Sequence, residues 1–319
     1  MCIRDRLNLF PLVERVKLSF ILTYFKYGKG SDEILYNWLS KKLSHPLAFK
    51  ITDSFCGWAL SINSKQISTR EFIAITKNIH KLRGPGIPQG GCKGVIDALV
   101  QRLTQLGGEI LYKSEVEEIL IEDNEAKKIV TNKEEHEFDV IISDIGPKRT
   151  LKLCGEENFP KSYVERIKKI REACGIKISI ACDKPMLGFS GVLFTPEAKR
   201  ISGLNEVTNA DPSLAPKGKH LLMSHQPLDS KANVKSEAKL GIEDLHELFP
   251  DFERHCEILA VQVFKGNLPV NRAISGEHIA PKTPIKNLYL VGDAIKPRGF
   301  METEGIAAGV MEVLNYIAQ

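Results

Sequence analysis

Hydrophobic positions recur every three or four residues through the first quarter of the chain, and this spacing predicts helices over residues 7–82. One run shows it clearly: Ile34, Leu35, Trp38, Leu39 and Leu43. Helix starts are predicted at 31–33 and at 68–71, the second with the Ser-x-x-Glu spacing of a capping box. Each helix is therefore expected to bury one face.

Residues 83–91 interrupt this pattern with four glycines and two prolines, which cannot continue a helix. Gln89 stands where a dinucleotide-binding fingerprint needs its third glycine, and Cys92 stands where a phosphate-binding P-loop needs lysine. We therefore expect a hinge between two domains, a place where ligand clefts lie. A helix over 94–106 follows, ended by Gly107 and Gly108.

Beyond residue 108 the pattern favours short strands. They are expected at 109–113, 116–122, 128–131, 138–143, 177–181, 192–195, 220–224 and 258–264, with a basic amphipathic helix over 160–173 and a second helix over 236–248. The chain ends with an apolar strand at 287–293, a Pro/Gly loop and a helix from 302 to 317. Such a strand–loop–helix unit is typical of nucleotide-binding α/β layers.

The C-terminal unit carries the strongest chemical signal. Gly292 and Asp293 place a carboxylate at the carboxyl edge of a sheet, where ligands bind in open α/β folds. Small residues at Gly305, Ala307 and Ala308 let a backbone approach the next helix, whose free N–H groups favour an electron-rich group. In the alternative interpretation, Asp293 caps that helix and the small residues pack it.

Composition narrows the class of protein. The chain has 319 residues, 43% of them hydrophobic and 26% charged, which excludes a disordered chain and allows two domains. A net charge of +4 does not predict nucleic-acid binding. The seven scattered cysteines, none in a Cys-x-x-Cys motif, favour reduced thiols and a cytoplasmic location. No metal site is predicted, and no apolar run reaches the roughly 18 residues of a membrane span.

Four segments together resemble one family. Residues 88–99 resemble the Pro-x-Gly-Gly helix start of phytoene-desaturase-like flavoproteins, which belong with the amine oxidases and protoporphyrinogen oxidases. Residues 107–110 with 114–119 resemble the strand pair of that family, and 138–143 its strand returning to the cofactor domain. Residues 283–293 resemble its final flavin strand. These segments follow one another in the family's order.

The resemblance implies an α/β protein in which a Rossmann-like FAD/NAD(P)-binding domain is interleaved with an α+β substrate domain. The substrate domain would comprise 7–87 and 160–282, and the FAD-binding domain 88–159 and 283–319. The family's first βαβ unit, a strand–Gly-x-Gly-x-x-Gly–helix that holds the pyrophosphate, is nowhere in these residues. The FAD-binding domain is therefore expected to be incomplete.

The first six residues support the same expectation. Met1–Arg6 is similar to the translation of a transposon-type sequencing adapter. We therefore expect residues 1–6 to be an artefact, the natural chain to begin upstream of Leu7, and this N-terminally truncated fragment to be inactive by itself.

The resemblance also implies roles for individual residues around FAD. Val116 would contact the adenine through its backbone, and Asp293 would hydrogen-bond the ribityl chain, with Gly292 permitting close approach. Glu304 departs from the family, which more often has glycine there. The residues implied to face the isoalloxazine ring are Met301, Glu302, Gly305, Ile306 and Ala307.

The implied function is an FAD-dependent oxidoreductase that moves hydride from an apolar, isoprenoid- or carotenoid-like small molecule to flavin. Alternatives on the same fold are an amine or protoporphyrinogen-type oxidase and a non-catalytic binding protein, like the Rab GDP dissociation inhibitors. No catalytic residue is assigned; Arg298 and Glu302 are polar candidates beside the predicted flavin, and the alternative role for each is surface charge. The Lys-rich amphipathic helices at 7–26 and 161–173 could dock peripherally on a membrane, and the alternative is that their charges form a solvated face.

Overall fold

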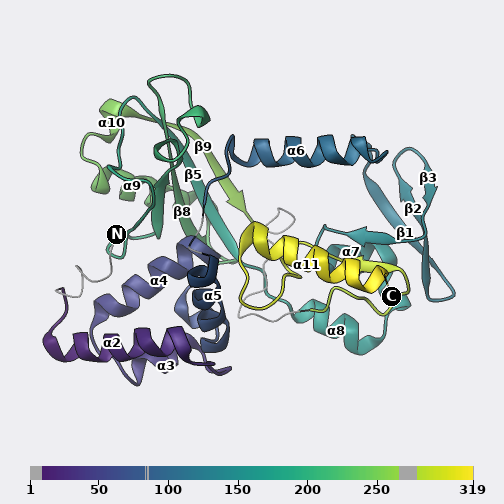
Figure 1. Ribbon diagram of the computed structural model, residues 1–319, viewed down its shortest axis with the longest axis horizontal. Coiled ribbons are helices and arrows are strands. Elements are labelled where there is room, and N and C mark those ends of the chain that lie inside the picture. The colour runs from purple at the N-terminus through teal and green to yellow at the C-terminus, as the bar shows by residue number, and fades with distance from the viewer. Residues whose placement is uncertain (1–8, 83, 85, 266–278, 319) are drawn as a thin grey trace. The chain divides into compact units, whose positions relative to one another are not determined.

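A computed structural model describes residues 9–82, 84, 86–265 and 279–318 (Figure 1). The chain forms two compact units, each assembled from two separate segments. Unit 1 comprises Met1–Ile96 and Ala173–Leu268, and unit 2 comprises Asp97–Glu172 and Pro269–Gln319. The chain therefore passes from one unit to the other after residues 96, 172 and 268. The sequence-based prediction placed these three domain boundaries after residues 87, 159 and 282.

The first segment of unit 1 is helical, as its periodicity predicts. It contains α2 (Leu12–Tyr27), α3 (Leu35–Ser40), α4 (Pro46–Leu60) and α5 (Thr69–Leu82). The predicted capping of α5 is confirmed, because Ser68 Oγ accepts a hydrogen bond of 3.2 Å from Glu71 N. The helix start predicted at 31–33 is wrong: α3 begins at Leu35, since the Ser31 backbone N–H donates instead to Thr69 Oγ1 at 2.9 Å.

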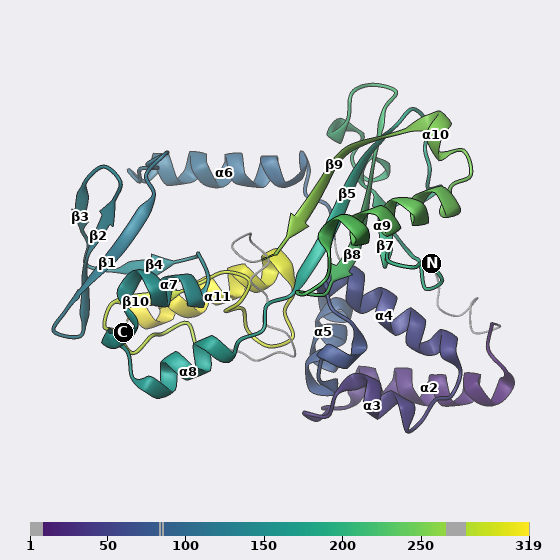
Figure 2. The ribbon, with the colours of Figure 1, turned by 180° about the vertical axis from the view of Figure 1, so that it is seen from behind.

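The second segment of unit 1 is an antiparallel sheet with strand order β6-β7-β8-β5-β9. Its strands are β5 (Cys174–Cys182), β6 (Val192–Phe194), β7 (Gly203–Glu206), β8 (His220–Leu228) and β9 (Cys256–Phe264). Ile176, Ile178 and Ile180 alternate onto one buried face, which packs against α9 (Val234–Leu248) and α10 (Phe252–His255) (Figure 2). Leu245 of α9 is fully buried in this core. Strand β7 was absent from the sequence prediction.

Helix α6 (Gly91–Gln105) begins three residues earlier than its predicted start at 94. The predicted stop at Gly107 is confirmed, with a φ of +81° and its N–H bonded to Thr104 O. The strand predicted at 109–113 is wrong, because these residues are irregular and pair with no described strand. Their apolar side chains, led by Tyr112 at 73% exposure, lie in solvent rather than in a sheet.

Unit 2 is built on two small sheets. The hairpin of β1 (Val116–Glu122) and β2 (Glu125–Thr131) turns at Asp123 and Asn124, whose φ values of 49° and 61° suit a tight turn, and β3 (Glu135–Glu137) extends it. Strand β4 (Ile141–Ser143) pairs in parallel with β10 (Leu288–Leu290). The remaining elements are the helices α7 (Pro147–Cys154), α8 (Lys161–Lys169) and α11 (Glu302–Ile317).

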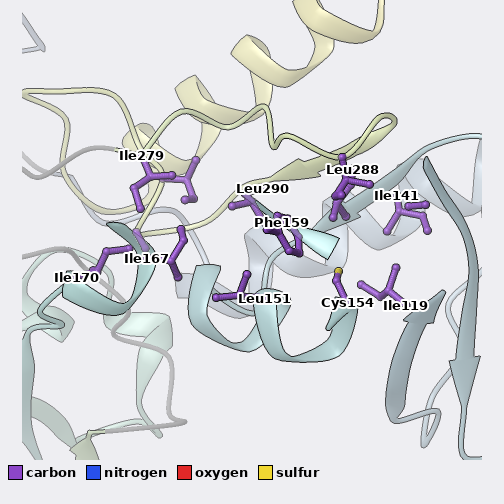
Figure 3. Packing of buried hydrophobic residues seen from close by; sticks show 14 residues of the cluster. Ile119, Ile141, Leu151, Cys154, Phe159, Ile167, Ile170, Ile279, Leu288 and Leu290 are labelled. Carbon is purple, nitrogen blue, oxygen red and sulfur yellow. The ribbon is translucent and has the colours of Figure 1, made fainter. Parts of the chain in front are cut away.

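The core of unit 2 joins its two segments. Figure 3 shows Leu288 beside Ile141, and Phe159 beside Leu290. Asn287 reinforces this junction from the surface, since its Nδ2 donates to Ala126 O and to Asp139 O, both at 2.8 Å. Its Oδ1 accepts from Ala126 N at 3.0 Å. One side chain therefore ties the hairpin, β4 and β10 together.

The apolar stripe of helix α8 packs into the core of unit 2. Ile167 is fully buried, and Tyr163 and Val164 pack against the same core. This stripe therefore stabilises the fold, and the membrane contact of residues 161–173 stays a prediction. Within the described ranges, no helix is both long and apolar enough to cross a membrane.

Candidate functional site

Two carboxylates meet at the carboxyl edge of the parallel strands in unit 2. Asp144 directly follows β4, and Asp293 follows β10 by three residues. Because Leu290 is paired with Ser143 in this parallel ladder, both carboxylates lie at the edge where α/β sheets bind ligands. Desolvation first, and the negative charge of Asp293 second, raise the pKa of Asp144.

Gly292 lies between these carboxylates in a conformation that requires glycine. Its φ is +101°, and a Cβ at this position would lie 2.2 Å from Asp144 Oδ1. A side chain at this position would have to displace the Asp144 carboxylate, and the positive φ also favours glycine. The close approach seen here is that of Asp144, and the expected approach of a cofactor to Gly292 stays a prediction.

A buried cation completes this cluster. Lys296 is 6% exposed, and its Nζ forms an ion pair with Asp293 Oδ1. A Cβ at Gly305 would lie 2.9 Å from Lys296 Cδ, so glycine at this position lets α11 pack against the lysine. With two carboxylates to one ammonium group, the edge suits hydrogen-bond donors such as hydroxyl groups better than phosphate.

The start of α11 explains the departure at Glu304. Met301 N donates to Glu304 Oε1 at 3.1 Å, which caps the first turn of the helix. Glu302 takes a φ of +45°, a conformation that is uncommon outside glycine and that concentrates at functional sites. Met301 and Gly305 are buried, Ile306 is half-buried, and Glu302 and Ala307 are exposed.

Two predicted positions, Val116 and Arg298, are not part of the cluster around Lys296. Val116 begins β1 opposite Thr131, and the ladder is irregular between Val116 and Glu118, which frees backbone groups from regular pairing. Arg298 is exposed. The structure thus brings Gly292, Asp293 and Gly305 together around Lys296.

Sequence reasoning missed Asp144 and Lys296. A signal for Asp144 was present, because it directly follows an apolar strand and precedes Gly146-Pro147. Lys296 had no comparable signal, since a lysine three residues after an aspartate is usually a surface residue. Its burial depends on the packing of α11, which the local sequence does not specify.

Unit 1 contains a second group of notable residues on the sheet face opposite its core. His225 of β8 pairs directly with Lys177 of β5, and the ring of Trp58 lies edge-on at 6.5 Å from the imidazole. Burial first, and Lys177 second, lower the pKa of His225 to about 4. The imidazole is therefore neutral at physiological pH.

The fold and the acidic edge define an α/β protein of the nucleotide-cofactor type, and comparison with known proteins specifies the family. The model of the flavin-containing amine oxidoreductases matches residues 9–304. The chain therefore belongs to the flavin-containing amine oxidoreductase family. This match confirms the expected relationship to the amine oxidases and the expected mixed α/β fold.

Two similar proteins support this family membership, and a third shares the fold. An uncharacterised protein of Methanocaldococcus jannaschii is 41% identical, over 98% of this chain and 75% of the relative. The crystal structure of an oxidoreductase from Methanosarcina mazei is 40% identical with a TM-score of 0.92, over 99% of this chain and 75% of that one. Putrescine oxidase bound to putrescine shares the fold alone, at 12% identity and a TM-score of 0.71, over 97% of this chain and 77% of that one.

Part of a flavin cofactor fits the residues of unit 2. The paired carboxylates at Asp144 and Asp293 can accept hydrogen bonds from a polyhydroxyl chain, and Gly292 lets them lie close together. The pyrophosphate of a dinucleotide needs a glycine-rich helix start. The 319 residues contain no Gly-x-Gly-x-x-Gly sequence that would supply it.

Proposed function

We propose that the protein acts as an FAD-dependent oxidoreductase on an apolar, isoprenoid-like substrate. The observation that carries this proposal is the acidic edge of the β4–β10 sheet in a chain of the flavin-containing family. When bound, FAD supplies a two-electron acceptor for hydride. The residues of this chain contribute binding and orientation.

In this proposal, the ion pair with Lys296 positions the carboxylate of Asp293, which accepts hydrogen bonds from the ribityl hydroxyl groups. Gly292 lets the carboxylate of Asp144 lie close to the backbone beside Asp293. The first turn of α11, with Met301, Glu302, Ile306 and Ala307, would face the isoalloxazine ring, and the backbone at Val116 would contact the adenine.

The residues around His225 in unit 1 favour an apolar substrate over a cationic amine. Lys177 places a positive charge there, which would repel a protonated amine. The neighbouring Trp58 and Met223 offer apolar surface, and the neutral His225 adds no charge that would attract a cation. We therefore favour isoprenoid oxidation over amine oxidation.

The 319 residues by themselves are not expected to retain FAD or to be active, because they contain no pyrophosphate-binding sequence. The test compares the chain alone with the chain fused, ahead of Leu7, to a relative's strand–Gly-x-Gly-x-x-Gly–helix segment. The fusion should copurify with flavin and show its visible spectrum, and the chain alone should not.

Two variants make this test specific. Asp293→Ala in the fusion should lose most of the flavin, whereas Asp139→Ala, an exposed aspartate of the same unit, should retain it. A folded but colourless fusion would favour the non-catalytic binding protein.

If the fusion is yellow, a second experiment tests the substrate class. Anaerobic bleaching by an isoprenoid polyene but not by a primary diamine supports an isoprenoid substrate, and the reverse result supports an amine oxidase.

We also propose that the protein is cytoplasmic and contacts membranes peripherally through α2. Leu12, Val16 and Phe20 lie along one side of this helix and are 73%, 51% and 73% exposed. Arg15 and Lys26 add positive charge to the helix, while the carboxylate of Glu14 is paired with Lys17. An exposed apolar stripe with basic flanks suits the interface of an anionic membrane.

A further inference from the structure

Two cysteines face each other at one end of the sheet in unit 1. Cys182 is the last residue of β5, and Cys256 is the first residue of the edge strand β9. They are direct partners in the antiparallel ladder, and their Sγ atoms are 3.1 Å apart. The two thiols are therefore already in contact.

The register of the ladder suits a covalent bond between them. Asp183 N donates to His255 O at 3.0 Å, so residues 183 and 255 form a hydrogen-bonded pair. Adjacent pairs alternate in type, which makes Cys182 and Cys256 a non-hydrogen-bonded pair with Cα atoms about 4.5 Å apart. That separation lies within the range of about 4.4–6.8 Å that disulfides span.

The two thiols differ in access to solvent. Cys182 is 1% exposed, whereas Cys256 is half-buried and can meet a reagent. Burial raises the pKa of both thiols, and Asp183 and Glu206 act in the same direction, while Lys184 opposes them at Cys256. The thiolate of Cys256 is therefore scarce at neutral pH, and its reaction should be slow but faster in alkali.

We propose that Cys182 and Cys256 form a reversible disulfide that makes unit 1 sensitive to oxidation by small disulfides. The Cys256 thiolate attacks one sulfur of glutathione disulfide, forming a mixed disulfide and releasing one glutathione thiolate. The Cys182 thiolate then attacks Cys256 Sγ and releases the second glutathione. Two electrons pass to glutathione disulfide, and the two protons lost by the cysteines are taken up by the released thiolates.

This bond would fasten the edge strand of the sheet. The two residues are 74 positions apart, and the segment between them contains β6, β7, β8, α9 and α10. Closing a loop of this length restricts the unfolded chain and stabilises the folded unit. It would also hold β9, whose Leu259 and Val261 are exposed, against β5. The inference does not depend on the proposed flavin chemistry.

The test uses the 319-residue chain with Cys2→Ser and Cys92→Ser to suppress bonds between molecules, because Cys92 is exposed. After incubation with glutathione disulfide, peptide mapping without reductant should find a Cys182–Cys256 cross-link. Titratable thiols in denaturant should fall from five to three, the seven of the sequence less the two replaced. Dithiothreitol should restore them.

Oxidation should also raise the melting temperature by roughly 5 °C. Cys256→Ser should lose both the cross-link and this rise, whereas Cys174→Ser, a buried cysteine at the other end of β5, should keep both. A full thiol count after oxidation, a stable glutathione adduct at Cys256 or a cross-link between other cysteines would overturn the proposal. Mapping of the parent chain decides it even if a variant does not fold.

Discussion

The carboxylate of Asp144 lies against the backbone of Gly292, with space for a hydrogen but not for a methyl group: a Cβ would be 2.2 Å from Oδ1. Gly292→Ala should therefore destabilise unit 2 by about 2–4 kcal/mol, from backbone strain at positive φ together with steric overlap. Hydrogen exchange of the β4 and β10 amides measures this loss.

Gly107 provides the matched control, because its φ is +81° but no atom lies within 4 Å of the added Cβ. Gly107→Ala should cost about 1 kcal/mol, from the backbone alone. Removing the Asp144 side chain should lessen the cost of Gly292→Ala. Equal costs for the two glycine substitutions would contradict the proposed contact.

The raised pKa of Asp144 predicts the sign of a pH effect. A raised pKa means that the folded state holds the proton more tightly, so this contribution to stability is present at low pH and is lost as pH rises through the folded pKa. Asp144→Asn, which mimics the protonated form, should be slightly more stable than the parent at pH 7. The advantage should vanish near pH 3, as measured by denaturant unfolding at both values.

His225 predicts the opposite slope in unit 1. Its pKa is lowered from 6.5 to about 4, so the unfolded state binds more protons between these values. Stability should fall by about 2–3 kcal/mol as pH drops from 7 to 4. His225→Gln should remove this part of the slope, whatever its effect at pH 7. Parallel pH profiles for parent and variant, followed by tryptophan fluorescence, would count against a desolvated imidazole.

The exposed stripe of α2 predicts binding to anionic vesicles. Phe20→Ser should reduce cosedimentation several-fold, since a 73% exposed aromatic ring is the largest apolar group on the stripe. Leu99→Ser on α6, where the leucine is 66% exposed, makes the same change of polarity elsewhere and should leave binding unchanged. Equal losses in both variants would show that α2 has no special role.

Sequence reasoning succeeded where a local signal decides the structure. Glycines at 107 and 108 end α6, and the Ser68–Glu71 pair begins α5. It failed at 109–113, where an apolar run resembles a strand but pairs with no strand among the described residues. Pairing depends on distant segments, and hydrophobic pattern alone does not report it.

The same limit applies to the candidate site. Gly292 and Asp293 are recognisable because they end a strand and resemble a known motif. To predict that Asp144 contributes to the site, one must know that β4 pairs with β10, and these strands are far apart in the sequence. The burial of Lys296 requires that α11 pack against this lysine at Gly305, which is a tertiary contact.

The interleaving of the two units has a consequence for synthesis of the protein on the ribosome. Asn287 and Ala126, which bond to each other, are 161 residues apart, and the whole second segment of unit 1 is made between them. The nascent chain must therefore carry β4 without its partner until β10, at residues 288–290, has been synthesised. A stop codon between residues 291 and 302 would therefore remove the whole of α11 from unit 2 while leaving every residue of unit 1 in place.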